Sequence, residues 1–245
     1  MAAAAESGDD DAMADVNPGL EGVVVLDTAI AEPDRAGGSL RYRGVDIEDL
    51  VGIVPFGRVW GLLVDDAFHP GLQAGVPVVL PHRTGDVRVD VQAGLATLAP
   101  TLGLKALLDV TDAEARDGLA LASGAALSFV AQSARDPELP VVPQTRIEES
   151  DDAVTRFMLT WQGDPDPAHV RAVDAYFSSA AEHGLNASTF TARVVASTGA
   201  DVAAAMSGAV GAMSGPLHGG APTRVLSMIE EIEQIGDATA YVKSV

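Results

Sequence analysis

Two histidines, His183 and His218, are the side chains best placed to do chemistry in this sequence. Each lies at a break between predicted helices, in Ala-Glu-His-Gly-Leu-Asn-Ala-Ser and in Gly-Pro-Leu-His-Gly-Gly-Ala-Pro. Polar side chains at helix ends can face a cleft, whereas histidines in polar or proline-flanked surroundings are more often surface or packing residues. We interpret the other three in that second way: His69, His82 and His169.

His218 is the stronger candidate, because a helix is predicted to begin just after it. Ala221 and Pro222 suit a first helical turn, which leaves His218 and the flexible pair Gly219-Gly220 at the amino end of that helix. The positive end of a helix dipole disfavours a protonated imidazole. A neutral ring there can donate a hydrogen bond to a developing oxyanion or enolate. The alternative is that His218 only satisfies a helix terminus.

His183 begins a cluster of hydrogen-bonding side chains that includes Asn186 and Ser188. Such a cluster, just past a helix end, is suited to holding a carboxylate. The alternative is that Asn186 and Ser188 only cap the helix that follows. Arg193, one to two turns further on, either supplies charge to such a site or points into solvent.

The composition and the apolar spacing predict a mostly α-helical fold around these residues. The chain is 47% hydrophobic but only 4% aromatic, so Ala, Val, Leu and Met must fill the core, and these side chains suit closely packed helices. Apolar residues recur at helical spacing in seven segments. These segments begin near Asp46, Pro55, Asp86, Asp112, Asp166, Asn186 and Asp201.

Only one strand-forming region is predicted. The run Val23-Val24-Val25, followed by turn-forming residues at 32–34 and 37–38, indicates a small amino-terminal hairpin. Residues 1–18 are Ala- and Asp-rich without apolar periodicity, and we expect them to form a disordered acidic tail. In the predicted helix after Asp201, the small residues Ser207, Gly211 and Gly215 share one face, which indicates a tight helix pair or a subunit interface.

The overall charge makes nucleic acid a poor partner. There are 35 acidic and 15 basic residues, a net charge of -20, and no basic stripe.

The absence of cysteine fits a reducing cytoplasm. No secretory signal is recognisable at the start of the chain, and the apolar stretch 202–217 is shorter than the roughly 20 residues of a membrane span. The sequence contains no Gly-x-Ser-x-Gly motif of the hydrolases, no Walker phosphate-binding loop and no His-Glu-x-x-His metal-binding motif. Its glycine-rich stretches do not have the spacing of a dinucleotide-binding motif.

Two segments resemble the consecutive signature stretches of citrate synthases. They are His-Gly-Leu-Asn-Ala-Ser-Thr-Phe-Thr-Ala-Arg at 183–193 and Gly-Pro-Leu-His-Gly-Gly-Ala at 215–221. The segment Leu-Arg-Tyr-Arg-Gly-Val-Asp-Ile-Glu-Asp-Leu at 40–50 is similar to the Tyr-Arg-Gly segment near the amino terminus of that family. The likeness spans residues 20–245 and is closest to the short actinobacterial type.

The resemblance implies that acetyl-CoA and oxaloacetate condense to citrate and CoA in a mostly helical, two-domain homodimer, without a metal or prosthetic group. It implies that His218 is catalytic and stabilises the enol of the acetyl group while an aspartate removes a proton. It also implies that His183, Asn186, Gly219 and Gly220 bind substrate. Enolisation of a thioester requires both a base and a partner for the oxyanion.

The likeness also implies domain limits and open questions. Residues 19–217 would form an incomplete large domain and residues 218–245 the start of a small domain. The family's catalytic aspartate, its Gly-x-Gly-His-Arg segment and its carboxylate-binding arginines have no counterpart here. We therefore expect this chain alone to be inactive, either as a truncated citrate synthase or as half of a split enzyme. A methylcitrate synthase that uses propionyl-CoA and a non-catalytic binding or dimerisation module are the alternatives.

Overall fold

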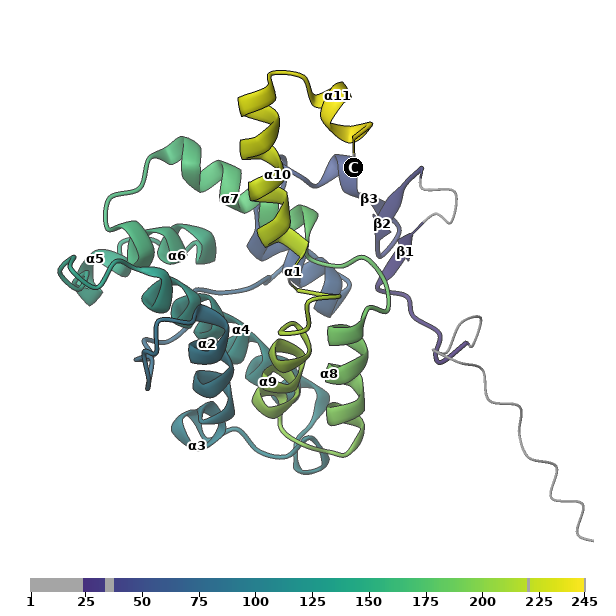
Figure 1. The fold of residues 1–245 in the computed structure, drawn as a ribbon. Helices are drawn as coiled ribbons and strands as arrows, with labels where there is room; N and C mark the ends of the chain where they lie inside the picture. The colour runs from purple at the N-terminus through teal and green to yellow at the C-terminus, as the bar shows by residue number, and fades with distance from the viewer. Residues whose placement is uncertain (1–23, 34–37, 220, 245) are drawn as a thin grey trace, which may run out of the picture.

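A helical body with a small sheet at one edge makes up most of the molecule (Figure 1). The computed structural model describes residues 24–33, 38–219 and 221–244. The predicted tail over residues 1–18, the residue Val23 and the residue Gly220 lie outside the described part.

The predicted, mostly α-helical fold class is confirmed. In the part of the chain that the structure describes, two short 3₁₀ helices accompany the α-helices: η2 (Ile47–Asp49) and η3 (Leu107–Asp109). The α-helices among the described residues are α1 (Phe56–Asp65), α2 (Val87–Ala96), α3 (Leu98–Leu102), α4 (Asp112–Ala134), α5 (Gln144–Ile147), α6 (Ala153–Gln162), α7 (Pro167–Ser179), α8 (Ala187–Ser197), α9 (Val202–Ala212), α10 (Ala221–Ile235) and α11 (Ala238–Val242).

Side-chain caps explain where several of these helices begin. The carboxylate of Asp86 accepts a hydrogen bond from a backbone N–H in the first turn of α2, and Asp201 does the same for α9. Sequence reasoning missed α6. Its signals are Asp152, whose side chain caps the helix, and buried apolar residues at the i, i+3, i+4 spacing, namely Val154, Phe157 and Met158.

The amino-terminal hairpin is present, but the predicted strand is wrong. The strands are β1 (Ala31–Pro33), β2 (Leu40–Tyr42) and β3 (Val45–Asp46), paired antiparallel in the order β1-β2-β3. Val24 and Val25 lie outside them and are exposed. A β-branched run becomes a strand only where a partner strand pairs with it.

The turn between β2 and β3 explains the third strand, which sequence reasoning missed. Arg43 and Gly44 both have positive φ angles, of 49° and 81°. Two successive positive φ values are the pattern of the tight turns whose twist matches antiparallel strands. The guanidinium of Arg43 also donates to the backbone oxygen of Leu63 near the end of α1, at 3.0 and 3.2 Å, which ties this turn to the helical body.

The largest hydrophobic cluster lies where α2, α4 and α9 pack together. Helix α2 approaches α4 closely at Gly94, because a Cβ there would lie 2.8 Å from the ring of Phe129. The buried members of the cluster are Val91, Leu95, Leu98, Ala122, Ala125, Phe129 and Ala203.

The small-residue face of α9 packs within the chain. Ser207 donates to the backbone oxygen of Gln92 in α2 at 3.0 Å, and a Cβ at Gly211 would lie 2.6 Å from the amide of Gln92. The predicted tight helix pair is therefore α2 against α9. A subunit interface on this face stays a prediction.

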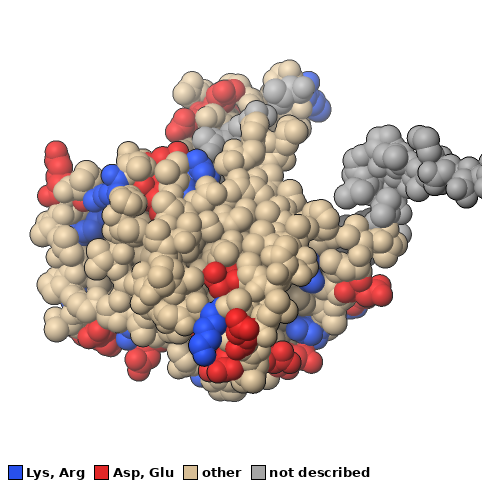
Figure 2. Space-filling model, turned by 90° about the horizontal axis from the view of Figure 1, so that it is seen from below, with Lys and Arg blue, Asp and Glu red and all other residues tan. Residues whose placement is uncertain are grey.

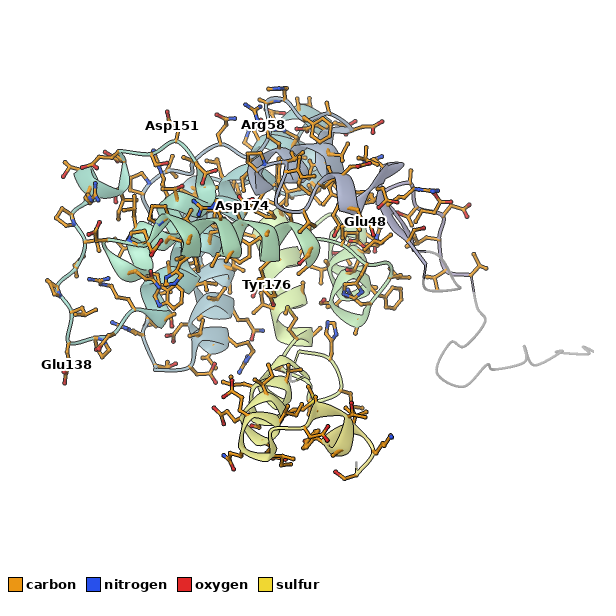
Figure 3. All side chains as sticks on the ribbon, turned by 90° about the horizontal axis from the view of Figure 1, so that it is seen from above. Glu48, Arg58, Glu138, Asp151, Asp174 and Tyr176 are labelled. Atoms are coloured by element: carbon orange, nitrogen blue, oxygen red, sulfur yellow. The ribbon has the colours of Figure 1, made fainter. Side chains whose placement is uncertain are left out.

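A carboxylate from α7 caps the start of α1. The backbone N–H of Phe56 donates to Asp174 at 3.0 Å, while Pro55, which precedes the helix, provides no side-chain cap. Asp174 is labelled in Figure 3, within the helical body. Burial raises the pKa of Asp174. This contact fixes α7, and with it the loop that carries His183, against the amino-terminal part of the fold.

Within the described part of the chain, no single helix is both long and apolar enough to cross a membrane. One pair, residues 87–96 and 98–109, meets the length and composition of a span only when taken together across a 53° bend.

Candidate functional site

His218 lies in the connection between α9 and α10, as its position in the sequence predicts. Its backbone N–H donates to the oxygen of Gly215 at 3.0 Å, so it belongs to a tight turn after α9. Its side chain is partly buried, and its Nε2 lies 2.9 Å from the hydroxyl oxygen of Ser188 in α8. The backbone after His218 thus leads to α10, while the ring of His218 turns back to α8.

A continuous series of hydrogen bonds joins four side chains, with the two histidines at its ends. Ser188 donates to Oδ1 of Asn186 at 2.8 Å, and Nδ2 of Asn186 lies 3.1 Å from Nε2 of His183. With the contact of His218 to Ser188, the order is His183, Asn186, Ser188, His218. Residues 35 positions apart in the sequence are therefore brought into one cluster, which we call the histidine cluster.

Donor and acceptor chemistry places the protons in this cluster. Oδ1 of Asn186 accepts from the backbone N–H of Thr189 and from Ser188, so the only hydrogen of the Ser188 hydroxyl is already used. Nε2 of His218 must then be the donor to Ser188. Conversely, Nδ2 of Asn186 is a donor, so Nε2 of His183 is an acceptor. A neutral His183 therefore carries its proton on Nδ1, and its ring is exposed, so this N–H can donate to a ligand.

Asn186 has the capping role that the sequence left open, while its binding of a carboxylate stays a prediction. Its side chain caps α8 through the 2.9 Å contact from the N–H of Thr189, and it also contacts His183 and Ser188. Ser188 likewise does more than begin a helix, because it connects Asn186 to His218. A capping residue and a ring-orienting residue are here the same side chain.

Gly219 makes a close approach to the end of α9. A Cβ at this position would overlap the backbone oxygen of Met213. Any other residue would force this backbone apart, so the turn that carries His218 requires glycine here. Gly220 lies outside the described residues.

Arg193 does not join the histidine cluster. Within the described residues, its side chain makes no hydrogen bond or ion pair to another residue. No carboxylate of the described part lies within ion-pair distance of His183 or His218 either. The described residues also contain no group of three or more His, Asp or Glu side chains arranged to hold a metal ion.

Tyr42 is a residue near the cluster that sequence reasoning missed. Its hydroxyl donates to the backbone oxygen of Ser178 at 3.0 Å and accepts from the N–H of Glu182 at 3.3 Å. The only signal for it in the sequence was its place in the Tyr-Arg-Gly segment at 42–44. The segment just before His183 is thereby held by the sheet.

One cavity among the described residues lies away from the histidines. It has a volume of about 560 Å³ and lies between residues 74–80, the end of α4, the loop at 136–143 and α6. Neither His183 nor His218 lines it. In the described part of the chain, the candidate site is therefore a surface cluster at the junction of α7, α8 and the α9–α10 turn.

Charge on the surface shown in Figure 2 is mixed. Among the described residues on that face, Lys and Arg side chains lie among Asp and Glu side chains and do not form a stripe. That nucleic acid is not a partner remains a prediction.

The comparisons with known proteins agree with the geometry. The sequence model of the family described as "Citrate synthase, C-terminal domain" matches residues 19–245. The chain is 65% identical over 229 residues to "Putative citrate synthase 2" of Mycobacterium tuberculosis. This alignment covers 93% of this chain and 61% of that protein. It is 32% identical over 251 residues to the citrate synthase of Acidithiobacillus ferridurans, which covers 92% of this chain and 63% of that one.

A solved structure gives the same result. The crystal structure of citrate synthase from Thermotoga maritima superposes with a TM-score of 0.66 at 25% sequence identity, over 89% of this chain and 61% of that one. The chain thus spans a little over three fifths of the length of these two curated relatives. The family sequence model, the relatives and the superposition together show that the chain belongs to the citrate synthase family.

Proposed function

We propose that this chain is part of an enzyme that condenses acetyl-CoA with oxaloacetate and water to give citrate and CoA. Family membership supports this proposal, and so does the connection of the two signature stretches through the histidine cluster. The observation that carries it is the 2.9 Å contact between His218 and Ser188, since it joins the turn before α10 to the capped start of α8.

In this proposal His218 is the partner of the developing enol. The reaction removes a proton from the methyl group of acetyl-CoA and places negative charge on the thioester oxygen. A neutral imidazole N–H stabilises that charge without first losing a proton of its own.

Ser188 would select the nitrogen that donates. With its hydrogen on Asn186, Ser188 accepts from Nε2 of His218. If Nε2 releases its proton to water and Nδ1 takes one up from water, the hydroxyl hydrogen of Ser188 can turn to Nε2, and Nδ1 has no hydrogen-bond partner among the described residues. The substrate oxygen would then receive a hydrogen bond from Nδ1. In this arrangement Oδ1 of Asn186 loses the hydrogen bond from Ser188 and keeps the one from the N–H of Thr189.

His183, Asn186, Gly219 and Gly220 would bind oxaloacetate. The exposed Nδ1–H of His183 is a donor suited to a carboxylate or carbonyl oxygen. Gly219 would allow the backbone to approach the substrate closely. The enol carbon then attacks the keto carbon of oxaloacetate, a C–C bond forms, and water cleaves the thioester to release CoA.

The carboxylate that removes the methyl proton would be one that does not contact His218 in this structure, since no carboxylate of the described residues pairs with His218. We propose that neither a metal nor a prosthetic group takes part. The chain as given, tested alone, is therefore expected to release no CoA.

We further propose a homodimer in the cytoplasm, with residues 19–217 in a large domain and the small domain starting at 218. Helices α10 and α11 extend away from the helical body (Figures 1 and 3), which supports a boundary near residue 218. Exposed apolar side chains on and near α8, such as Val194 and Leu185, are suited to a subunit contact.

The test is release of CoA thiol from acetyl-CoA and oxaloacetate, followed with dithionitrobenzoate. The complete protein is expected to release CoA only when both substrates are present. A parallel reaction with propionyl-CoA distinguishes citrate from methylcitrate synthesis. Tight oxaloacetate binding without turnover by the complete protein would instead indicate a binding module, and the proposal would fail.

A further inference from the structure

Tyr42 is buried in the small sheet, far from His183 in the sequence but close to its loop. It is the last residue of β2 and is fully buried. Its Cα pairs with Ala31 in β1 and with Val45 in β3, so the backbone is fixed from both sides. Its ring packs with Leu50, Val59 and Leu62, and the partly buried Ala181 lies against the same cluster.

The hydroxyl of Tyr42 binds the backbone on both sides of the end of α7. It donates to the oxygens of Ser178 and Ser179, at 3.0 and 3.3 Å, and accepts from the N–H of Glu182 at 3.3 Å. The chain from 178 to 182 therefore curves around one oxygen atom. Burial raises the pKa of Tyr42, so the hydroxyl keeps its hydrogen and remains both a donor and an acceptor at neutral pH.

His183 is the next residue after this anchor. On its other side, the N–H of Gly184 donates to the carboxylate of Glu182 at 2.6 Å, and Asn186 caps α8. The exposed ring of His183 has Asn186 as its side-chain partner, so its position depends on the backbone that carries it. Tyr42 fixes that backbone on the amino-terminal side, and Asn186 fixes it on the carboxy-terminal side.

We propose that Tyr42 is a positioning residue for His183 and so sets the affinity of the site for oxaloacetate, an inference that rests on the proposed function. Tyr42 does not itself belong to the histidine cluster, and it acts through the backbone of Glu182. A phenylalanine would fill the same space in the sheet. The hydroxyl is therefore the part of the side chain that does the positioning, and its loss should affect binding through His183 more than the enol chemistry at His218.

The experiment uses Tyr42→Phe in the complete protein. Loss of the hydroxyl is expected to raise both the KM and the calorimetric Kd for oxaloacetate about tenfold, because small displacements of a binding group have large effects. The kcat should fall less than about threefold, since His218 keeps its contacts. Tyr176→Phe is the matched control, because it removes the hydroxyl of an exposed tyrosine on α7, and it should change neither value.

A double-mutant cycle separates positioning from general loss of stability. If Tyr42 acts through His183, then Tyr42→Phe with His183→Ala binds oxaloacetate no more weakly than His183→Ala alone. Ser133→Ala, which removes a buried hydrogen bond to Asp90, serves as a destabilised control and should leave the oxaloacetate Kd unchanged.

Each other outcome overturns the inference. Additive losses in the cycle, or an unchanged KM and Kd in Tyr42→Phe, would show that the hydroxyl does not act through His183. Loss of the helical circular dichroism signal in Tyr42→Phe would show that the hydroxyl supports the whole fold and not this loop. If the unmodified protein releases no CoA, it is the proposed function that fails. In that case an unchanged calorimetric Kd in Tyr42→Phe would still overturn the positioning role.

Discussion

At the scale of single residues, the histidine cluster depends on one hydroxyl group. Among the described residues, Ser188 is the only side chain that makes hydrogen bonds to both Asn186 and His218. A neutral imidazole can carry its proton on either nitrogen, and the neighbouring hydrogen bond decides which one. In the proposed reaction, Ser188 would therefore select which nitrogen of His218 carries the proton, although Ser188 is not expected to react.

Ser188→Ala should lower kcat about tenfold, because His218 loses the contact that orients its ring and selects its tautomer. The KM for oxaloacetate should change less than about threefold, since His183 keeps its contact with Asn186. Steady-state kinetics in the thiol-release assay measure both values. Ser197→Ala, on the same helix, is the control and should behave as the unmodified enzyme. A selective rise in KM with kcat unchanged would contradict this role.

The fold stabilises the charge of Asp90 through hydrogen bonds from two neighbouring residues. Asp90 is fully buried and accepts hydrogen bonds from the N–H and the hydroxyl of Thr84 and from the hydroxyl of Ser133. Burial opposes its charge, but the hydrogen bonds outweigh burial, and the pKa of Asp90 is lowered. The ionised carboxylate thus joins the loop before α2 to the end of α4.

The sign of the pH dependence follows from this lowered pKa. The stabilisation by Asp90 is fully present above the ordinary carboxyl pKa of about 4 and is lost as the pH falls through the lower value in the folded protein. Asp90→Asn should therefore lower the thermal midpoint clearly at pH 7 and less at pH 3. Thermal unfolding across this range checks the expectation. A difference between the two proteins that grows toward acid would contradict it.

At the scale of elements, the turn between α9 and α10 carries the geometry that His218 requires. The sequence predicted both helices and placed His218 between them, because the Asp201 cap and the Ala221-Pro222 start are local signals. It did not predict that His218 would contact α8. That contact depends on how tightly α8 and α9 pack, which no local pattern encodes.

Gly219→Ala should reduce turnover more than tenfold, because the new methyl group would overlap the backbone oxygen of Met213 and displace the neighbouring His218. Gly215→Ala is the matched control in the same turn. A Cβ there has the backbone oxygen of Ala212 as its nearest neighbour, at 3.6 Å, which is ordinary contact, so turnover should stay within about twofold. Equal losses in the two variants would show that the close approach at Gly219 is not what the site requires.

The sheet shows the limit of sequence reasoning about elements. The run at 23–25 has residue types that are typical of a strand. Its described members, Val24 and Val25, are nevertheless exposed, and neither belongs to a strand of the sheet. The strands formed instead at Leu40–Tyr42 and its neighbours, where Arg43-Gly44 makes the turn. Pairing and burial decide which segment becomes a strand, and both are properties of the tertiary structure.

At the scale of the whole molecule, the fold class and most helices could be predicted because low aromatic content, apolar spacing and capping residues all favoured helices. The two candidate histidines could be found from their places at helix ends. Tyr42 could not be recognised as a positioning residue, because its contact with Glu182 joins residues 140 positions apart. The protons in the histidine cluster likewise follow only from contacts between separate elements.

The central claim is that His218 stabilises the enol during condensation, and the kcat of His218→Ala in the complete protein tests it most directly. We expect kcat for CoA release to fall about 10²- to 10³-fold, the usual effect of removing one oxyanion donor, with an unchanged thermal midpoint. His82→Ala, which changes an exposed histidine outside the cluster, should keep full activity. A His218→Ala enzyme with kcat within about threefold of the unmodified protein would contradict the account.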